Sequence, residues 1–459
     1  MMIDIALIEA LVAGTALFEF DCALLTQPTN SNPERRQGSA TVTQSESGDL
    51  QLKVNITDPV DFARSLQSSF SAISGRLIEE EEFYRLEATR NQSETWVCER
   101  FLGKDHLSYK ANGSTMTGAL PQLSMKSAET ASLPRHHVYQ ALVGELPLPY
   151  FSSEIGQDPS FQFLIDSTTV RLAPKRGYVL LHATSESAPV NPGLVNRLLE
   201  ALFIATGRWL HSCYHFVASG AESETRIVSF LRGKEREFLW SAIRENDPKS
   251  LTEFVRSYLA LTAIEPGPFF GYWQKVFSAW EAGIVVAALP VSIFVEGLVK
   301  EFFPDLMSET PEVIDAADKM VAHLATAPDI ATTLITRGQN AILGIKQKSP
   351  TSALKKLVAE GWFEESLIAR WRSVRNSAAH AHEFTATADL AEQQKTMDGV
   401  MACLHLFYVL LFIRARFGGT FLDLSKHAFP PTRLKPLQSL VSTTQIPAQN
   451  TTSKPASAG

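Results

Sequence analysis

The stretch that decides the fold of the C-terminal half runs from Trp362 to Phe384 and reads WFEESLIARWRSVRNSAAHAHEF. Gly361, immediately before it, predicts the end of a preceding helix, because glycine readily adopts the left-handed conformation found there. Glu364 and Glu365 suit the positive first turn of a new helix. The stretch therefore predicts a helix that begins near Glu364.

Two faces can be distinguished along this helix. Apolar residues recur at steps of four and three, and they predict the face that packs on the domain core. These residues are Leu367, Trp371, Val374, Ala378 and Ala381. Small or singly polar residues follow similar steps roughly 140–180° away, at ~100° per residue. These residues are Ala369, Ser373, Asn376 and His380. Because small side chains allow another helix to approach closely, we expect a two-fold dimer to pack through the second face.

Arg375, Asn376 and His380 carry the chemistry that this helix suggests. A histidine with a pKa near ~6.5 can take the proton from a ribose 2′-hydroxyl or return one to the leaving 5′-oxygen. A guanidinium can grip a phosphate with two donors and stabilise its developing charge. Asn376, one turn before His380, could orient the imidazole or the phosphate. The pattern indicates metal-independent RNA cleavage, leaving a 2′,3′-cyclic phosphate and a free 5′-hydroxyl.

Charge is distributed unevenly along the chain. The whole chain carries a net charge of −7, so general electrostatic capture of nucleic acid is not expected. Between Arg337 and Arg375, however, eight basic residues face three acidic ones, a local net charge of +5. The basic residues are Arg337, Lys346, Lys348, Lys355, Lys356, Arg370, Arg372 and Arg375. This island predicts contact with a phosphate backbone, with Arg370, Arg372 and His382 as weaker substrate contacts. A solvated helix face is the alternative.

The rest of the chain predicts an α+β, multidomain protein. Residues 1–190 predict a mainly β domain from Phe18 to about Leu181, with a sandwich as the expected arrangement and a short helical insertion near Pro59 to Phe70. Alternating apolar and polar residues indicate its half-buried strands. Examples are Leu50 to Ile56, Phe83 to Ala88 and Thr95 to Phe101.

Helical periodicity replaces this alternation from Asn191 onward. We expect an all-helical region with an extension over residues 191–279 and a bundle over residues 280–430. Residues 431–459 are rich in Ser, Thr, Gln, Pro and Ala, a composition that predicts a disordered tail.

Nothing in the sequence predicts a membrane segment, a cofactor or a metal. The apolar N-terminus from Ile3 to Phe18 lacks a basic leader and holds acidic residues, which is not typical of a signal peptide. Gly283 to Val295 and Val400 to Ile413 are shorter than the roughly 20 residues needed to span a bilayer, so we expect buried core helices. Four widely spaced cysteines without a CxxC pair are typical of reduced thiols. A cytoplasmic, soluble protein is expected.

Two further histidine pairs could in principle supply metal ligands, but their positions argue against a metal site. His136 and His137 are adjacent within the β region, and adjacent strand residues point to opposite faces. His211 and His215 are one helical turn apart, but no acidic or Cys partner joins them, so a packed helix face is the favoured interpretation.

The segment from Trp371 to His380 resembles the RNxxxH form of the Rx4–6H signature of HEPN domains. The helix from Leu289 to Lys300 looks like the first core helix of such domains, and the resemblance covers about Trp280 to Phe417. It implies a dimeric, metal-independent endoribonuclease of HEPN type. The motif Arg and His would be Arg375 and His380, and Asn376 matches the polar residue that often follows the Arg.

A β-rich front half followed by a HEPN domain is also similar to ApeA-type anti-phage proteins. That similarity implies a toxin or effector that cleaves tRNA or other cellular RNA once infection is sensed. The β domain would sense the trigger or restrain the nuclease, and a phage trigger or an antitoxin would be its partner. The competing hypothesis is a non-catalytic HEPN module that binds RNA or a nucleotide, or serves as a dimerisation scaffold. In a third interpretation, Arg375 and His380 have no catalytic role. They lie near the C-terminal end of a helix because positive side chains there interact favourably with the helix dipole.

Overall fold

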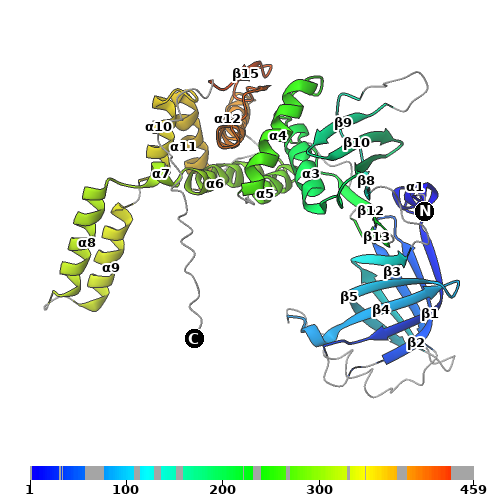
Figure 1. Cartoon of the computed structure of the whole chain (residues 1–459). Helices are drawn as coiled ribbons and strands as arrows, with labels where there is room; N and C mark the ends of the chain where they lie inside the picture. The colour runs from blue at the N-terminus through cyan, green and yellow to red at the C-terminus, as the bar shows by residue number, and fades with distance from the viewer. Residues whose placement is uncertain are drawn as a thin grey trace, which may run out of the picture. The chain divides into compact units, whose positions relative to one another are not determined.

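A computed structural model describes residues 3–29, 33, 35–56, 77–107, 114–128, 136–150, 159–220, 222–230, 239–264, 269–327, 331–346, 348–379 and 390–435. The chain divides into two compact units, Met1–Glu281 and Ala282–Gly459 (Figure 1). Strands dominate the first unit and helices the second, which confirms the α+β organisation. The expected insertion at Pro59 to Phe70 lies outside the described residues.

The first unit begins with a short helix and a set of antiparallel strands. They are α1 (Ile5–Ala13), β1 (Leu17–Thr26), β2 (Arg35–Gln44), β3 (Leu50–Ile56), the 3-10 turn η1 (Glu80–Glu82), β4 (Phe83–Arg90), β5 (Glu94–Leu107) and β6 (Ser114–Leu120). The strands predicted at Leu50 to Ile56, Phe83 to Ala88 and Thr95 to Phe101 are confirmed as β3, β4 and part of β5.

These six strands close on themselves. The order is β4-β1-β2-β3-β6-β5, and β4 also pairs with β5, so the ring has no free edge. The arrangement is a barrel, and the expected sandwich is therefore wrong for this part of the chain. Because β4 pairs with β1 on one side and with β5 on the other, the six-stranded barrel is closed by backbone hydrogen bonds.

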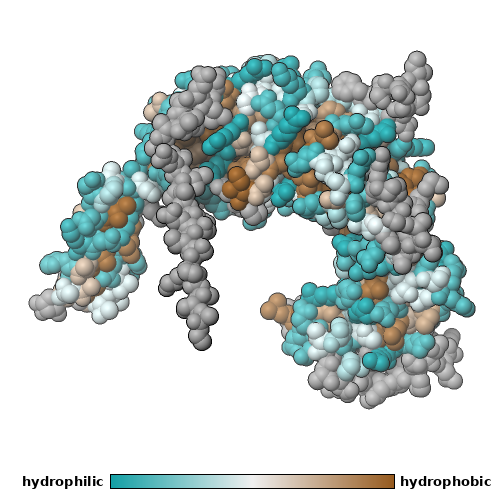
Figure 2. Space-filling view, in the orientation of Figure 1, coloured by the Kyte–Doolittle hydropathy of each residue, from teal (hydrophilic) through white to brown (hydrophobic). Residues whose placement is uncertain are grey.

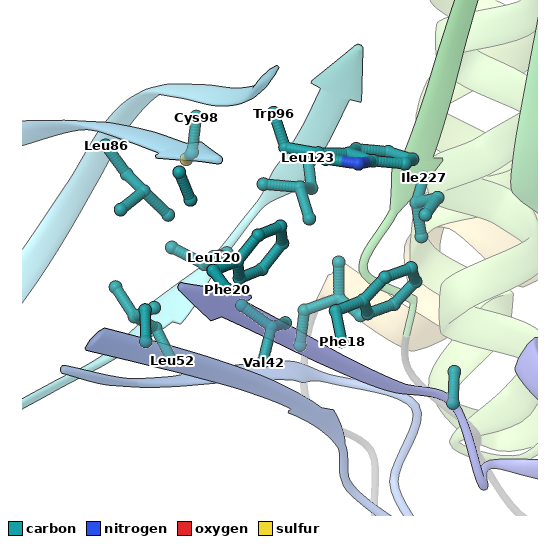
Figure 3. Packing of buried hydrophobic residues seen from close by; sticks show 14 of the residues in the cluster. Phe18, Phe20, Val42, Leu52, Leu86, Trp96, Cys98, Leu120, Leu123 and Ile227 are labelled. Atoms are coloured by element: carbon teal, nitrogen blue, oxygen red, sulfur yellow. The ribbon is translucent and has the colours of Figure 1, made fainter. Parts of the chain in front are cut away.

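The interior of the barrel is filled by apolar side chains that alternate with exposed ones along each strand. Figure 3 shows Phe18, Phe20, Val42 and Leu52 facing the Trp96 side chain across the core. Helix α1 adds Ile8 and Leu11 to the same cluster, and both are fully buried. Asp4 caps this helix by accepting a hydrogen bond from the Leu7 N–H at 2.9 Å. The apolar N-terminus therefore belongs to the barrel core.

A second series of strands continues the sheet beyond the barrel. The order after β5 is β7-β13-β12-β8-β11-β10-β9. The bounds are β7 (Gln122–Ala128), β8 (His136–Val143), β9 (Phe161–Ile165), β10 (Thr168–Lys175), β11 (Tyr178–Ser185), β12 (His211–Ser219) and β13 (Glu222–Val228). Three helices complete the unit: α3 (Pro192–Thr206), α4 (Pro248–Ile264) and α5 (Phe269–Glu281).

The predicted all-helical extension over residues 191–279 is wrong in its centre. Helix α3 starts at Pro192 after the Asn191 cap, as the sequence indicated. Strands β12 and β13 follow it, and β12 inserts between β13 and β8 of the sheet. The cause is tertiary, since the β8 edge offers unpaired backbone groups that this segment satisfies.

The second unit consists mainly of helices and ends in a two-stranded hairpin. The elements are α6 (Ile284–Phe302), α7 (Pro304–Met307), α8 (Pro311–Ala325), α9 (Thr332–Ile345), α10 (Pro350–Ala359), α11 (Glu365–Ala379), α12 (Leu390–Arg414), β14 (Thr420–Leu422) and β15 (Pro431–Arg433). Helices α6, α11 and α12 pack against one another and form its core. The predicted tail began at residue 431, but Pro431–Arg433 pairs with β14, and residues after 435 lie outside the described part.

Helices α8 and α9 lie side by side and pack mainly on each other (Figure 1). Large apolar side chains remain exposed on them, namely Met320, Leu334, Leu343 and Ile345. Figure 2 shows hydrophobic residues scattered among hydrophilic ones on this pair.

Helix α12 is the most apolar helix of the second unit. Every side chain from Val400 to Ile413 is buried, which confirms the predicted core helix. Among the described residues it is the one helix long and apolar enough to cross a membrane, and 78% of its most apolar window is buried inside the structure. In α6, Ala287, Val291 and Val295 are buried, whereas Val286 and Ile293 remain exposed.

Candidate functional site

Helix α11 carries the motif, and local sequence explains where it begins. Gly361 adopts φ +77° after α10, and the Trp362 N–H donates to the Leu357 carbonyl at 3.0 Å, which ends the preceding helix. The first turn of α11 starts at Glu365. The predicted helix is therefore confirmed in position and in its start signal.

The two predicted faces of α11 differ in burial. Leu367, Trp371 and Val374 are buried on the core side. Ala369, Ser373 and Asn376 are exposed. The face of small residues is thus open to solvent in the single chain, as a surface for another helix would be.

A buried hydrogen bond fixes α11 on α6. The Trp371 indole Nε1–H donates to the Ser292 backbone carbonyl over 2.9 Å. Pro290 lies inside α6, and the Ser292 hydroxyl donates to the Leu289 carbonyl at 2.8 Å. Because this hydrogen bond is buried among apolar side chains, it determines the position of α11 along α6 and the rotation of α11 about its own axis.

Arg375 projects from α11 toward a carboxylate that sequence reasoning missed. Its Nη2 lies 2.8 Å from Glu296 Oε2 on α6, and Lys300 Nζ lies 2.8 Å from Glu296 Oε1. Burial opposes ionisation of Glu296, but hydrogen bonds and charges from Lys300 and Arg375 outweigh it, and the pKa of Glu296 is lowered. The carboxylate is therefore ionised at neutral pH and holds the guanidinium in one place.

The sequence indicates the pairing of Glu296 with Lys300 but not its contact with Arg375. Glu296 and Lys300 stand four residues apart in the helix whose sequence looks like the first HEPN helix, a spacing typical of an ion pair on one helix. Nothing local connects Glu296 to Arg375, which lies 79 residues further along the chain. Only the packing of α11 on α6 brings them together.

The remaining predicted site residues divide into two groups. Asn376 lies on α11 one position after Arg375, with its side chain exposed, while His380 and His382 lie outside the described residues. Arg370 and Arg372 are also exposed on α11, and Arg370 Nη1 donates to the Ser425 carbonyl at 2.9 Å. The structure thus describes half of the predicted motif, the half that would bind phosphate.

The basic island is partly neutralised by acids from outside its sequence window. Lys346 pairs with Asp318, and Lys348 Nζ lies 3.4 Å from Glu309. With the Arg375–Glu296 pair, three of the eight cations have carboxylate partners that the count along the sequence omitted. Arg370 and Arg372 have no such partner among the described residues. Part of the remaining positive charge therefore lies on the exposed side of α11.

The other histidine pairs do not form a metal site. His136 and His137 lie on β8 and reach different partners, Ser219 Oγ and His182 Nε2, so the predicted divergence of their side chains is confirmed. His211 and His215 lie on strand β12, so the predicted helix face is wrong. Burial and nearby Arg226 lower the pKa of His215 to about 4. Within the described ranges, no three His, Cys, Asp or Glu side chains could hold a metal ion together.

Comparison with known proteins adds no assignment: no known protein family matches the chain, and no curated protein or solved structure is significantly similar to it.

Proposed function

We propose that the second unit is a metal-independent endoribonuclease of HEPN type, with Arg375 and His380 as its catalytic residues. Arg375 would bind the scissile phosphate and stabilise the charge that develops on it. His380 would exchange protons with the 2′-hydroxyl and the leaving oxygen, and Asn376 would orient one of these groups. Cleavage would leave a 2′,3′-cyclic phosphate and a 5′-hydroxyl.

The observation that carries this proposal is the placement of Arg375. The Arg375 side chain is 44% exposed, its guanidinium is anchored at one nitrogen by Glu296, and exposed Asn376 is the next residue on α11. An anchored guanidinium costs little reorganisation when a phosphate arrives, which is the condition for electrostatic catalysis. The unneutralised charges of Arg370 and Arg372 on the same helix favour RNA as the anion.

Dimerisation is part of the proposal. The exposed small-residue face of α11 would pack on its counterpart in a second copy, and the Arg375 and His380 side chains of both copies would share one cleft. In the cell the protein would act as an antiviral effector or toxin directed at tRNA or other RNA. The β-rich unit would sense the trigger or restrain cleavage.

A second candidate is a non-catalytic module that binds RNA or a nucleotide. The Glu296–Arg375 ion pair favours it, because a carboxylate already occupies part of the guanidinium that a nuclease would offer to phosphate. Growth arrest that depends on His380 would favour the nuclease. A harmless wild type that retains RNA binding would favour the module.

The test is RNA cleavage by purified protein in the presence of EDTA. The wild type should degrade RNA, whereas Arg375→Ala and His380→Ala should each lower the rate by about 10²–10⁴, as expected for loss of electrostatic or proton-transfer catalysis. Lys395→Gln, an exposed change on α12, serves as the matched control and should cleave normally. Activity that survives both alanine substitutions would refute the proposal.

A further inference from the structure

The hairpin loop, residues 423–430, connects β14 to β15 and has a well-defined conformation. The Asp423 N–H donates to the Pro430 carbonyl at 2.9 Å and closes the loop. Ala428 and Phe429 adopt φ +60° and +45°, a left-handed conformation that residues with a Cβ rarely take. Because such a conformation persists only where surrounding contacts impose it, the fold holds this loop in place.

The Asp423 carboxylate holds the first half of the hairpin loop together. Its Oδ1 accepts hydrogen bonds from the Ser425 N–H at 3.1 Å and from the Ser425 hydroxyl at 2.5 Å. Its Oδ2 lies 3.2 Å from Lys426 Nζ. His405 Nε2 of α12 lies 3.4 Å from Oδ1, and the His405 and Asp423 side chains are both more than nine-tenths buried. Burial opposes ionisation of the carboxylate, but these three partners outweigh it and lower the pKa of Asp423.

The two loop residues that Asp423 binds are also in contact with α11. Lys426 Nζ lies 3.1 Å from Oε1 of Glu364, the residue before the helix. Arg370 Nη1 donates to the Ser425 carbonyl at 2.9 Å. Glu364 and Arg370 are six residues apart, so the two contacts span about 9 Å along the helix axis. Each contact is exposed and weak by itself, but both depend on one buried carboxylate.

The hairpin loop and helix α6 hold α11 at adjacent residues. Trp371 donates to the Ser292 carbonyl of α6, and Arg370 donates to the loop. Adjacent residues of a helix lie ~100° apart around its axis, so the two contacts together restrain the rotation and the tilt of α11. Arg375 lies five residues beyond Arg370, about 7.5 Å along the axis. A shift of α11 at Arg370 therefore displaces the guanidinium of Arg375.

We propose that Asp423 is a positioning residue of the nuclease, an inference that rests on the proposed function. Asp423 holds the hairpin loop against α11 through Ser425 and Lys426, and the loop keeps Arg375 at the scissile phosphate. Asp423 itself does not touch the RNA. A displacement of about 1 Å in a catalytic group can lower the rate by up to ~10²-fold. Loss of the Asp423 charge should therefore reduce turnover and leave the affinity for RNA unchanged.

Steady-state RNA cleavage by the full-length protein in EDTA separates turnover from binding. Asp423→Asn keeps the shape of the side chain and removes its charge, so kcat should fall about tenfold while KM stays within about twofold. Lys426→Gln breaks only the exposed contact with Glu364 and should lower kcat about twofold, also without a change in KM. Asp398→Asn is the matched control for the first change, because Asp398 is an exposed carboxylate of α12 that accepts from Gln394 at 2.7 Å. Lys395→Gln, exposed on the same helix, is the control for the second.

Hydrogen exchange measures the position of α11 without any cleavage. Backbone amides of α11 should exchange at least about threefold faster in Asp423→Asn than in the wild type. The amides of α8 and α9, which pack mainly on each other, should exchange at the same rate in both proteins. The double variant Asp423→Asn with Lys426→Gln should resemble Asp423→Asn alone, because Lys426 acts through the same loop.

An unchanged kcat, an altered KM alone, or wild-type exchange of α11 in the Asp423→Asn protein would overturn the inference. If Asp423→Asn does not fold, Lys426→Gln decides, and an unchanged kcat in that variant overturns the inference. Its failure is distinguishable from that of the nuclease proposal. Faster exchange of α11 in Asp423→Asn, in a protein whose wild type never cleaves RNA, refutes only the nuclease. Normal cleavage by Asp423→Asn refutes only the positioning role.

Discussion

The interior of the β-barrel and the interior of the helical unit differ in the polar groups that they enclose. The core of the barrel is apolar (Figure 3), and its strands also bury uncharged polar side chains such as Gln44 and Ser114. In the helical unit, His405 and Asp423 are buried and in contact. Among the described residues these are the only fully buried Asp, Glu, His, Lys or Arg side chains, whereas His182 and His215 of the first unit are partly buried. Burying an ionisable group costs free energy unless it is paired, and His405 and Asp423 are paired with each other. The comparison places the buried His405–Asp423 pair in the helical unit, the same unit that carries the proposed catalytic residues.

The largest effect should come from a cavity in the barrel. Phe20→Ala empties the centre of its core, where the side chain is 3% exposed, and should destabilise the first unit by about 3–5 kcal/mol. Hydrogen exchange should show lost protection in β1 to β6 and unchanged protection in α6 and α12. Equal loss of protection in both units would show that the barrel and the bundle are one cooperative structure.

Removal of the buried tryptophan hydrogen bond should have a smaller effect, in the other unit. Trp371→Phe keeps the aromatic packing but leaves the Ser292 carbonyl without its donor, at a cost of about 1–3 kcal/mol. Urea unfolding measures this loss, and RNA cleavage should fall with it because α11 loses its fixed position on α6. Unchanged cleavage by the folded variant would show that activity does not depend on the position in which this hydrogen bond holds α11.

Acidification should weaken the two units through different histidines. Burial lowers the pKa of His405, despite the opposing charge of Asp423, below its ordinary value of 6.5. On acidification, the imidazole of the unfolded chain therefore binds a proton at a higher pH than the buried imidazole of the folded chain. The stability that comes from keeping His405 neutral is lost as the pH falls below about 6.5. In the first unit, burial and the neighbouring His137 lower the pKa of His182 to about 4, with the same sign.

His405→Leu isolates the contribution from the helical unit. Thermal unfolding between pH 7.5 and 5.5 should show a shallower loss of stability in the variant than in the wild type. The contribution of His182 is present in both proteins and cancels in the comparison. Parallel curves would mean that the burial of His405 has no effect on the pH dependence of stability.

The smallest effect concerns the restraint on Arg375. Glu296→Gln removes the carboxylate that competes with phosphate for the guanidinium. Because a partly exposed ion pair contributes at most about 1 kcal/mol, RNA should bind roughly twofold to fivefold more tightly. Filter binding in a His380→Ala background measures this without cleavage. Weaker RNA binding would instead show that Glu296 is needed to place Arg375.

Sequence periodicity predicted local structure well, and its failures follow from long-range contacts. The alternation at Leu50 to Ile56 and the apolar stripe through Trp371 each specify one buried face, so both could be predicted. The sequence of His211 to Ser219 predicts a helix, but the segment is strand β12, because its pairing with β8 determines its structure. Closure of the barrel through the second β4 pairing is equally non-local.

The candidate site shows the same limit. Arg375 and Asn376 could be identified from the spacing on one helix. Glu296, and the His405–Asp423 pair, required the packing of separate helices and of the hairpin after α12. The count along the sequence also overestimates the net positive charge of the basic island between Arg337 and Arg375. Asp318 and Glu309, which lie outside that stretch, pair with two of its lysines.

The most direct test of the central claim is the chemistry of the RNA ends. Total RNA should be incubated with the wild type, Arg375→Ala or His380→Ala in EDTA, and its termini sequenced after selective capture of 5′-hydroxyl ends. The proposed mechanism predicts 5′-hydroxyl and 2′,3′-cyclic phosphate ends with the wild type alone. Fragments with 5′-phosphate ends, or 5′-hydroxyl ends produced equally by both variants, would contradict it.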